Sequence, residues 1–291
     1  MKILITGVSG FIGTHLAKLL LKNNYCVYGF DTRSPHLEID FIQGNLVSQQ
    51  GFDSIPWKEL DVVFHLASIG VKPDSRDWAP CVEVNVLGTH NLLEKMRAEK
   101  SSARLIYTNS FYEKHIFTHS DLKKNPYIET KFVATQMVRS FASSYFGRVI
   151  TLTLFQVYGP GDANTTVLPY VANQLANKRK AILGSGSGVR DWVFIDDVIS
   201  ALFKAIHVNV KSSFSEYDIG TGLLVSLRDI TKKLAVILDG VELLEFDSQR
   251  DRPDLDLKEK AKTFLPNWKC EVNIEEGLKK LSSSFLNRKN R

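Results

Sequence analysis

The stretch Met1-Lys-Ile-Leu-Ile-Thr-Gly-Val-Ser-Gly-Phe-Ile-Gly13 decides the fold of this chain. Residues 2–6 form a short apolar run without helical periodicity, which is typical of a buried strand. Residues 14–21 carry apolar side chains at helical spacing. Three glycines between the two segments permit, in order, a tight turn after the strand, approach of the backbone to a pyrophosphate, and close packing of helix on strand: Gly7, Gly10 and Gly13.

The start of this helix is predicted to bind phosphate. Its first N–H groups, including those of Phe11 and Ile12, have no partner inside the helix, and the helix dipole favours negative charge there. A second strand, expected at residues 26–30, is followed by Asp31, at about the 20-residue offset typical of an acid that binds a ribose. Asp31 would repel a 2′-phosphate, so we expect NAD, whereas Arg33 keeps NADP open as an alternative. The competing hypothesis is a sharp turn that binds nothing.

The composition is that of a soluble protein with a sizeable core. The chain has 291 residues, 44% of them hydrophobic, and a dispersed net charge of +5 that does not favour nucleic-acid binding. The basic residues at 288–291 are interpreted as a solvated tail. Three widely spaced cysteines without a C-x-x-C pattern indicate a reducing compartment. Because no window approaches the roughly 20 apolar residues that span a bilayer, and the apolar start lacks a cleavage-site pattern, we expect a cytoplasmic protein with no membrane partner.

Strand and helix patterns alternate along the first half of the chain. We expect further strands at residues 39–42, 61–67, 103–108 and 149–155, and helices at residues 82–96 and 127–146. Strands that alternate with helices of this length predict an α/β fold with a doubly wound parallel sheet. In such a sheet, ligands bind at the carboxyl ends of the strands.

The second chemical signal is the pair Tyr127 and Lys131, which lie four residues apart and therefore on one face of the expected helix. A lysine ammonium beside a phenol stabilises the phenolate, so we expect the pKa of Tyr127 to lie below its reference value of about 10. The preceding strand ends in Thr108-Asn109-Ser110, which brings a hydroxyl to the same place. Tyr127 is therefore a candidate general acid and base. An exposed helix pair without chemistry is the alternative.

These motifs together resemble the extended short-chain dehydrogenases/reductases, and among them the NAD-dependent epimerase/dehydratase group that acts on nucleotide sugars. The resemblance covers almost the whole chain. Beyond the glycine turn and the Tyr127/Lys131 pair, it rests on these segments: His65-Leu-Ala-Ser68, Asn85-Val-Leu-Gly-Thr89, Phe155-Gln-Val-Tyr-Gly-Pro160, Gly188-Val-Arg-Asp-Trp-Val-Phe-Ile-Asp-Asp-Val198 and Tyr217-Asp-Ile-Gly-Thr-Gly222.

The resemblance implies a role for each matching residue. Ser110, Tyr127 and Lys131 would be catalytic, and the last two would also contact the cofactor. The other cofactor contacts would be Gly7, Gly10, Phe11, Ile12, Gly13, Asp31, Arg33, Asn45, Leu46, Ala67, Ser68 and Asn85. The substrate contacts would be Ser110, Gln156, Thr166, Val167, Arg190 and Arg252, with Arg250 as an alternative to Arg252. A guanidinium such as that of Arg190 presents a planar donor fork to phosphate oxygens; the competing role for Arg190 is an ion pair with Asp191, Asp196 or Asp197.

The same resemblance implies two domains and an assembly. A Rossmann domain at residues 1–161, to which residues 190–207 return, would bind the cofactor. A smaller C-terminal α/β region at residues 162–291 would bind the substrate. Because this family commonly pairs its two long helices across a twofold axis, we expect a homodimer through residues 82–96 and 127–146.

Several positions depart from the family pattern. Gln156 and Thr166 stand where the family often has asparagine, and Asn45 replaces an aspartate beside the adenine. The 4,6-dehydratases need an acid and a base directly after the catalytic hydroxyl, whereas this chain has Phe111 and Tyr112 there. The first carboxyl after Ser110 is that of Glu113, which comes one residue after the two positions that the dehydratases use. Dehydration is therefore disfavoured.

The expected function is hydride transfer at C4 of a nucleotide-diphosphate sugar. A 4-epimerase is slightly favoured, because such enzymes keep one NAD bound and Asp31 favours NAD. The alternative is a 4-keto-sugar reductase that uses NADH or NADPH, and a non-catalytic NAD-binding regulatory protein is an alternative of another class. We expect no metal, since His115 and His119 are four residues apart but no carboxylate or cysteine completes a site.

Overall fold

The computed structural model describes residues 1–71, 75–118, 125–145, 147–251 and 257–287, so Arg252, His119 and the tail at 288–291 lie outside the described residues. The chain divides into two compact units, Met1–Thr153 with Ile199–Tyr217, and Leu154–Val198 with Asp218–Arg291. The first boundary falls before residue 161, because strand β7 (Gln156–Tyr158) pairs with β10 (Trp192–Phe194) inside the second unit. The segment that returns to the first unit begins later than expected, at Ile199.

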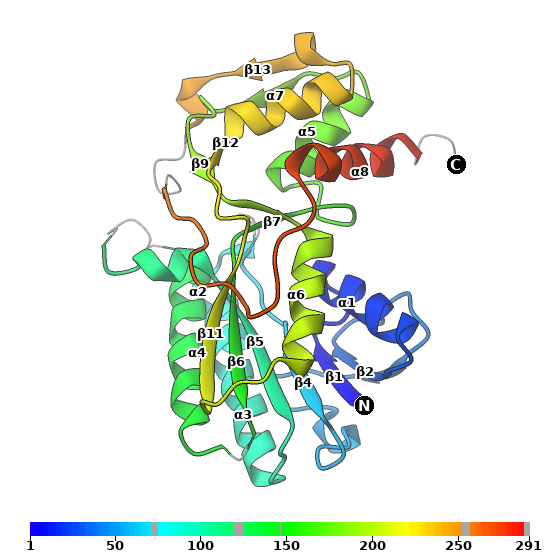
Figure 1. Ribbon diagram of the computed structural model, residues 1–291, viewed down its shortest axis with the longest axis vertical. Coiled ribbons are helices and arrows are strands. Elements are labelled where there is room, and N and C mark those ends of the chain that lie inside the picture. The colour runs from blue at the N-terminus through cyan, green and yellow to red at the C-terminus, as the bar shows by residue number, and fades with distance from the viewer. Residues whose placement is uncertain (72–74, 119–124, 146, 252–256, 288–291) are drawn as a thin grey trace. The chain divides into compact units, whose positions relative to one another are not determined.

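A seven-stranded sheet has the order β11-β6-β5-β4-β1-β2-β3 (Figure 1). Its strands are β1 (Lys2–Thr6), β2 (Cys26–Asp31), β3 (Asp40–Gln43), β4 (Val62–His65), β5 (Arg104–Ser110), β6 (Val149–Leu154) and β11 (Phe214–Ile219). The β1–β2, β2–β3, β1–β4 and β4–β5 pairs are parallel, which confirms the predicted doubly wound sheet. The strand order reverses at β1, because β2 lies on one side of it and β4 on the other. Ligands bind beyond the carboxyl ends of strands at such a switch point, which here are Thr6 and His65.

Helices cover both faces of this sheet, α1 and α6 on one and α3 and α4 on the other (Figure 1). Their bounds are α1 (Phe11–Lys22), α2 (Trp78–Cys81), α3 (Gly88–Ala98), α4 (Pro126–Ala142) and α6 (Ile195–His207). The helix expected at residues 82–96 is divided between the π-helix η3 (Val82–Leu87) and α3, and the short α2 directly precedes η3. Helix α4 begins at Pro126, where proline suits the first helical position, and the Asn125 side chain accepts the Tyr127 N–H at 3.1 Å.

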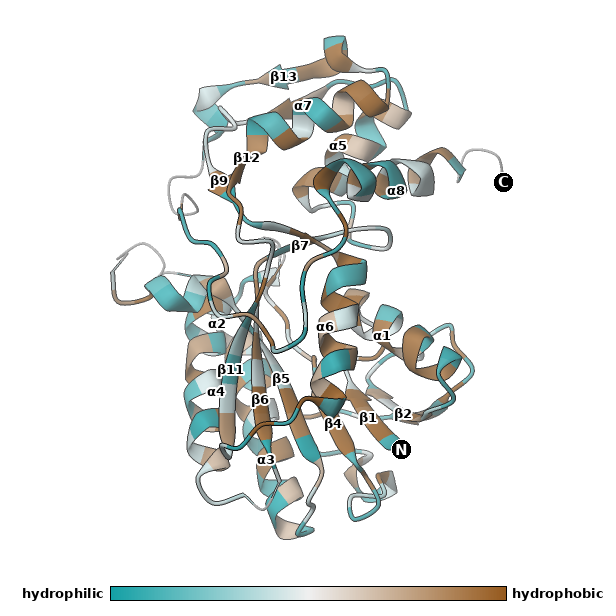
Figure 2. Ribbon diagram, in the orientation of Figure 1, coloured by the Kyte–Doolittle hydropathy of each residue, from teal (hydrophilic) through white to brown (hydrophobic). Residues whose placement is uncertain are grey.

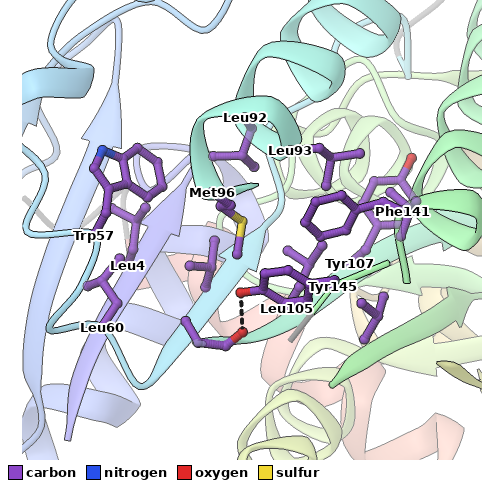
Figure 3. Packing of buried hydrophobic residues seen from close by; sticks show 14 of the residues in the cluster. Leu4, Trp57, Leu60, Leu92, Leu93, Met96, Leu105, Tyr107, Phe141 and Tyr145 are labelled. Carbon is purple, nitrogen blue, oxygen red and sulfur yellow. Dashed lines mark hydrogen bonds between the residues drawn. The ribbon is translucent and has the colours of Figure 1, made fainter. Parts of the chain in front are cut away.

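The core of the first unit lies between the sheet and helices α3 and α4 (Figure 3). Leu4 and Leu105 point from the strands toward Leu92, Met96 and other apolar side chains of the two helices. Burial of each such leucine stabilises the fold by roughly 2 kcal/mol. This core fixes α4 against β5, and so fixes the two elements that bear Tyr127 and Ser110.

In the part of the second unit that the structure describes, short strand pairs lie together with α-helices. Strand β7 pairs with β10 in parallel, β9 (Val189–Arg190) with β12 (Val225–Ser226) antiparallel, and β8 (Ala181–Leu183) with β13 (Leu244–Phe246) in parallel. The helices are α5 (Val167–Ala176), α7 (Leu227–Ile237) and α8 (Ile274–Leu286). Teal and brown bands along α7 and α8 show their amphipathic character (Figure 2). Among the described residues, no helix combines the length and the apolar character needed to cross a bilayer.

Candidate active site

The turn between β1 and α1 has the geometry of a phosphate cradle. Gly7 has a φ of +73°, a backbone conformation that residues with a side chain rarely adopt. A Cβ atom there would also lie 2.8 Å from the Cα of Ala67, so both the backbone conformation and the lack of space require glycine. A Cβ atom on Gly13 would overlap the carbonyl oxygen of Gly7. Gly10 is the N-cap of α1, and the buried hydroxyl of Ser9 has no hydrogen-bond partner among the described residues. These features fit a pyrophosphate at the start of α1.

Asp31 lies beside this turn at the end of β2. Its carboxylate accepts the Ser9 N–H at 3.1 Å and the Arg33 N–H at 3.3 Å. The Gly7 N–H donates to the Phe30 carbonyl at 2.9 Å and joins the ends of β1 and β2. The structure therefore brings together the glycine turn and the acid, as the spacing predicts, while the Arg33 side chain is exposed.

Two residues predicted beside the adenine follow β3. The Asn45 side chain accepts the Val47 N–H at 2.8 Å and thereby closes a local turn. The Leu46 side chain is buried in the core, and its carbonyl accepts Asn91 Nδ2 at 2.9 Å. The contact of Leu46 with adenine stays a prediction.

A buried hydrogen-bond chain runs across the switch point through His65. The Thr89 hydroxyl donates to the Asn85 carbonyl at 2.7 Å, so its oxygen must accept from His65 Nε2 at 2.9 Å. With the ring proton on Nε2, His65 Nδ1 accepts from the Thr6 hydroxyl at 2.8 Å. Burial, and then the charge of Lys131, lower the pKa of His65 to about 3. His65 is therefore neutral at neutral pH, and it holds the ends of β1 and β4 together.

We expect this neutral histidine to make the protein sensitive to acid. In the unfolded chain His65 binds a proton near its ordinary pKa of about 6.5, but the folded chain does not until about pH 3. The stabilisation that the folded protein gains from the neutral His65 is therefore fully present above pH 6.5. It is lost as the pH falls from 6.5 toward 3. Between pH 6.5 and pH 5 the loss is about 2 kcal/mol. Urea unfolding of wild type and His65→Gln at pH 7 and pH 5 measures this loss. The difference in the free energy of unfolding between the two proteins should be smaller at pH 5 than at pH 7 by that amount. An equal difference at both pH values contradicts the assignment.

Asn85 secures the loop that follows β4. Its side-chain amide accepts the Ile69 N–H at 2.9 Å and donates to the Ile69 carbonyl at 3.0 Å and to the Thr130 hydroxyl at 3.0 Å. Asn85 belongs to the π-helix, and such local widening is frequent at functional sites. Because its amide donors are used by protein groups, Asn85 positions the loop that carries Ala67 and Ser68. Its predicted contact with the cofactor remains a prediction.

The two hydroxyls predicted to converge do so. Ser110 is the last residue of β5 and the N-cap of the short 3-10 helix η4 (Phe111–His115), and its side chain hydrogen-bonds to that of Tyr127. Ser110 is only 6% exposed. The first turn of α4 and the end of β5 thus place a phenol and a serine hydroxyl in contact.

Lys131 lies one helical turn after Tyr127 and is 4% exposed. Its ammonium donates to the Thr108 carbonyl at 2.8 Å and lies 4.2 Å from the centre of the Tyr107 ring. Burial lowers the pKa of Lys131 to about 8, although the charge of Glu113 opposes this shift.

The expected lowering of the Tyr127 pKa is wrong for this structure. Burial raises the pKa of Tyr127, the negative charge of Glu113 raises it further, and the hydrogen bond with Ser110 opposes the rise. Helical spacing placed Lys131 on the correct face, but its ammonium binds the Thr108 carbonyl. The phenol of Tyr127 is therefore held in its protonated form.

Glu113 is a buried member of this site that the sequence reasoning did not include. Its carboxyl accepts the Ser110 N–H at 3.1 Å and lies 2.7 Å from the Thr135 hydroxyl. A glutamate three residues after a serine N-cap is the signature of a capping box, and this signal could have identified it.

The predicted substrate contacts other than Ser110 belong to the second unit. Gln156 begins β7 and donates its N–H to the Asp191 carbonyl at 2.9 Å, which places it next to the Arg190 strand. Thr166 is the N-cap of α5 and bonds to Asp162 at 2.7 Å, and Val167 is the first residue of that helix. Their roles as substrate contacts stay predictions, as does that of Arg252.

The alternative role for Arg190, an ion pair with a neighbouring aspartate, is not seen among the described residues. The Arg190 guanidinium donates to the Val189 carbonyl at 2.6 Å. The Asp191 carboxylate accepts backbone N–H groups, among them that of Ala261. The Asp197 carboxylate accepts the N–H groups of Glu271 and Val272. The described residues also contain no cluster of three or more His, Cys, Asp or Glu side chains that could hold a metal ion.

Comparison with known proteins finds relatives that are named as nucleotide-sugar enzymes. A dTDP-D-glucose 4,6-dehydratase of Dictyostelium discoideum is 30% identical over 80% of the chain, which spans only 61% of that relative. A putative UDP-glucose 4-epimerase of Methanocaldococcus jannaschii is 27% identical over 98% of both chains. A GDP-6-deoxy-D-mannose reductase of Pseudomonas aeruginosa is 26% identical over 94% of this chain and 99% of the relative.

Solved structures support the fold. The UDP-glucose 4-epimerase of Thermus thermophilus, solved in complex with NAD, has a TM-score of 0.80 at 22% identity and covers 98% of this chain and 99% of its own. The model of the NAD-dependent epimerase/dehydratase family matches residues 3–220, which include the glycine turn, Ser110, Tyr127 and Lys131. The chain is a member of the NAD-dependent epimerase/dehydratase family.

Proposed function

We propose that this protein transfers a hydride at C4 of a nucleotide-diphosphate sugar, with NAD as cofactor and 4-epimerisation as the favoured reaction. The observation that carries this proposal is the contact between the hydroxyls of Ser110 and Tyr127, with the buried Lys131 one helical turn after Tyr127 on α4. The glycine cradle and Asp31 support NAD as the cofactor, since a glycine turn at a helix start suits a pyrophosphate and an acid at the end of the second strand suits a ribose.

Each side chain has a task that follows from its contacts. NAD, when bound, supplies the acceptor and donor of the hydride. For oxidation, Tyr127 first releases its phenol proton to solvent and, as the phenolate, accepts the proton of the sugar hydroxyl. For reduction, the protonated phenol donates its proton to the sugar oxygen, and Ser110 hydrogen-bonds the same oxygen and fixes its place. Lys131 holds a positive charge in a buried setting, where it stabilises a phenolate when one forms.

Incubation with UDP-, dTDP-, GDP- and CDP-hexoses, with and without added NADH or NADPH, tests the proposal. An epimerase converts a sugar without net consumption of the cofactor. A reductase oxidises the added cofactor in proportion to product. Absence of both reactions for all four nucleotide classes would reject the proposed function.

A 4-keto-sugar reductase is the second candidate, and one observation favours it. Tyr127 keeps its proton because burial and Glu113 raise its pKa, and a protonated phenol is the donor that reduction of a ketone requires. The Pseudomonas aeruginosa relative is named a reductase.

Dehydration is the reaction that the site disfavours, although one relative carries that name. Phe111 and Tyr112, whose rings stack at 4.1 Å, stand where the 4,6-dehydratases need an acid and a base. The first carboxyl after these two residues in the sequence is that of Glu113. It is buried and hydrogen-bonds to the Ser110 N–H and the Thr135 hydroxyl, so its oxygens already have partners within the protein.

We expect Asp31 to account for much of the affinity for NAD. Asp31→Asn should weaken NAD binding by about 10- to 100-fold, since a hydrogen bond to a charged group contributes about 1.5–3 kcal/mol. It should also raise the affinity for NADP relative to NAD, because the negative charge is removed. Calorimetric titration of both cofactors measures this, with Asp40→Asn, an exposed acid at the start of the neighbouring strand β3, as the matched control. Equal losses in the two variants would contradict the assignment.

The homodimer is also a proposal. Trp78, Val82, Leu87 and Val133 are each more than 40% exposed, and they lie on α2, η3 and α4. Exposed apolar side chains on these helices support pairing through the helices that the family uses.

A further inference from the structure

Glu113 is an acid at the centre of a site where the family reaction assigns it no task. It is 7% exposed and follows Ser110 in the 3-10 helix η4. The two residues form a reciprocal pair: the Ser110 side chain accepts the Glu113 N–H, and the Glu113 carboxyl accepts the Ser110 N–H at 3.1 Å. The acid therefore fixes the backbone that carries the serine hydroxyl.

The second carboxyl oxygen of Glu113 contacts the Thr135 hydroxyl, which has two possible acceptors for its proton. The Thr135 hydroxyl lies 2.7 Å from Glu113 and 2.9 Å from the Lys131 carbonyl, but it has a single proton to donate. Both contacts are satisfied when Glu113 is protonated and donates to Thr135, which then donates to the Lys131 carbonyl. When Glu113 is ionised, the Thr135 proton turns toward it instead. The geometry thus accommodates both states of the acid.

The charged and titratable groups around Glu113 come from three elements. On α4 its charge acts on Lys131 and Tyr127, on β5 it acts on Tyr107, and on β11 the charge of Glu216 acts on it. Burial raises the pKa of Glu113 to about 7, against the charge of Lys131 and its two hydrogen bonds. In turn, the Glu113 charge raises the pKa of Lys131 and that of Tyr127.

We propose that Glu113 is a positioning residue: its carboxyl clamps the Ser110 turn and, by holding or releasing a proton at its contact with Thr135, sets the charge that Lys131 and Tyr127 experience. As Glu113 ionises, Lys131 keeps its charge to higher pH, and Tyr127 holds its proton more tightly. The working pH of the site is then set by an acid that need not touch the substrate.

Glu113→Gln tests this proposal, because glutamine keeps the shape of a protonated glutamate but cannot ionise. Without the negative charge, both Tyr127 and Lys131 release protons more easily. The two limbs of the pH profile of kcat/KM should therefore move to lower pH, by about one unit, as expected when a nearby charge is removed. Glu113→Asp retains the charge and should move the profile back toward wild type. Glu216→Gln, an equal charge change at a residue paired with Arg139, is the matched control and should shift the profile far less.

A second readout is independent of turnover, because the pH-profile test rests on the proposed function. Infrared difference spectra of wild type minus Glu113→Gln should show a protonated carboxyl that converts to carboxylate near neutral pH. In Thr135→Val this conversion should move to higher pH, since the hydroxyl that stabilises the carboxylate is gone. A carboxyl already fully ionised at pH 5 would overturn the proposal even if the enzyme turns over nucleotide sugars. If no nucleotide sugar reacts but the infrared titration is as expected, the proposed function fails and the proton-holding role of Glu113 stands.

Discussion

Tyr127→Phe is expected to lower kcat about a thousandfold on any nucleotide sugar that the wild type converts, since a positioned acid or base contributes about 10²- to 10⁴-fold. The phenol oxygen is the atom that meets the Ser110 hydroxyl, and phenylalanine removes it without changing the packing of the ring. Affinity for NAD should change little, because the phosphate cradle and Asp31 are unaltered. Turnover assays and NAD titration of the same preparation measure both quantities.

Tyr112→Phe is the matched control, since it removes a phenol hydroxyl from the turn that follows Ser110. Its kcat should remain within a few-fold of wild type. If Tyr127→Phe turns over substrate as fast as Tyr112→Phe, Tyr127 does not move the proton. If the variant also leaves the biological readout unchanged while NAD stays bound, the non-catalytic regulatory protein becomes the better account.

Asp191→Ala is expected to destabilise the second unit by about 4 kcal/mol, because buried N–H groups left without partners cost about 1–3 kcal/mol each. Asp191 is 1% exposed. Its carboxylate accepts the N–H groups of Thr221, Gly222 and Ala261 at 2.6, 2.8 and 3.0 Å, and the Thr221 hydroxyl at 2.6 Å. Urea unfolding, followed by the fluorescence of Trp192 and Trp268, measures the loss.

Asp196→Ala supplies the control for that loss. Asp196 is the exposed neighbour of this region, and its carboxylate pairs with Lys280 at 3.1 Å with 52% of the side chain exposed. Removal of such a surface ion pair should cost less than about 1 kcal/mol. Equal destabilisation by the two variants would show that the Asp191 carboxylate does not hold the backbone at Thr221, Gly222 and Ala261 as described.

Much of the fold could be predicted because local patterns and tertiary structure agree. The strand–glycine–helix order at residues 2–21 predicted the phosphate turn, and a φ of +73° at Gly7 shows why glycine stands there. Strand β11 was not predicted as a strand, because its residues, Phe214–Ile219, mix polar and apolar side chains at the edge of the sheet. The π-helix Val82–Leu87 was missed as well, since its apolar spacing looks like that of an α-helix.

The site was predictable in position but not in electrostatics. The four-residue spacing of Tyr127 and Lys131 predicts that both lie on one face of α4. It does not predict that the Lys131 ammonium donates to the Thr108 carbonyl. The position of Glu113 is visible in the sequence, but its burial arises from the packing of α4 on β5. These tertiary effects reverse the expected direction of the Tyr127 pKa shift.

The most direct test of the central claim is a single-turnover measurement of the nicotinamide. Wild-type protein loaded with NAD is mixed rapidly with UDP-, dTDP-, GDP- or CDP-hexose, and protein loaded with NADH is mixed with the corresponding 4-keto sugar. With at least one nucleotide class, the absorbance of the reduced nicotinamide should rise or fall in wild type and stay constant in Tyr127→Phe. A constant absorbance in wild type with every pairing, while NAD is demonstrably bound, would contradict hydride transfer to or from a nucleotide sugar.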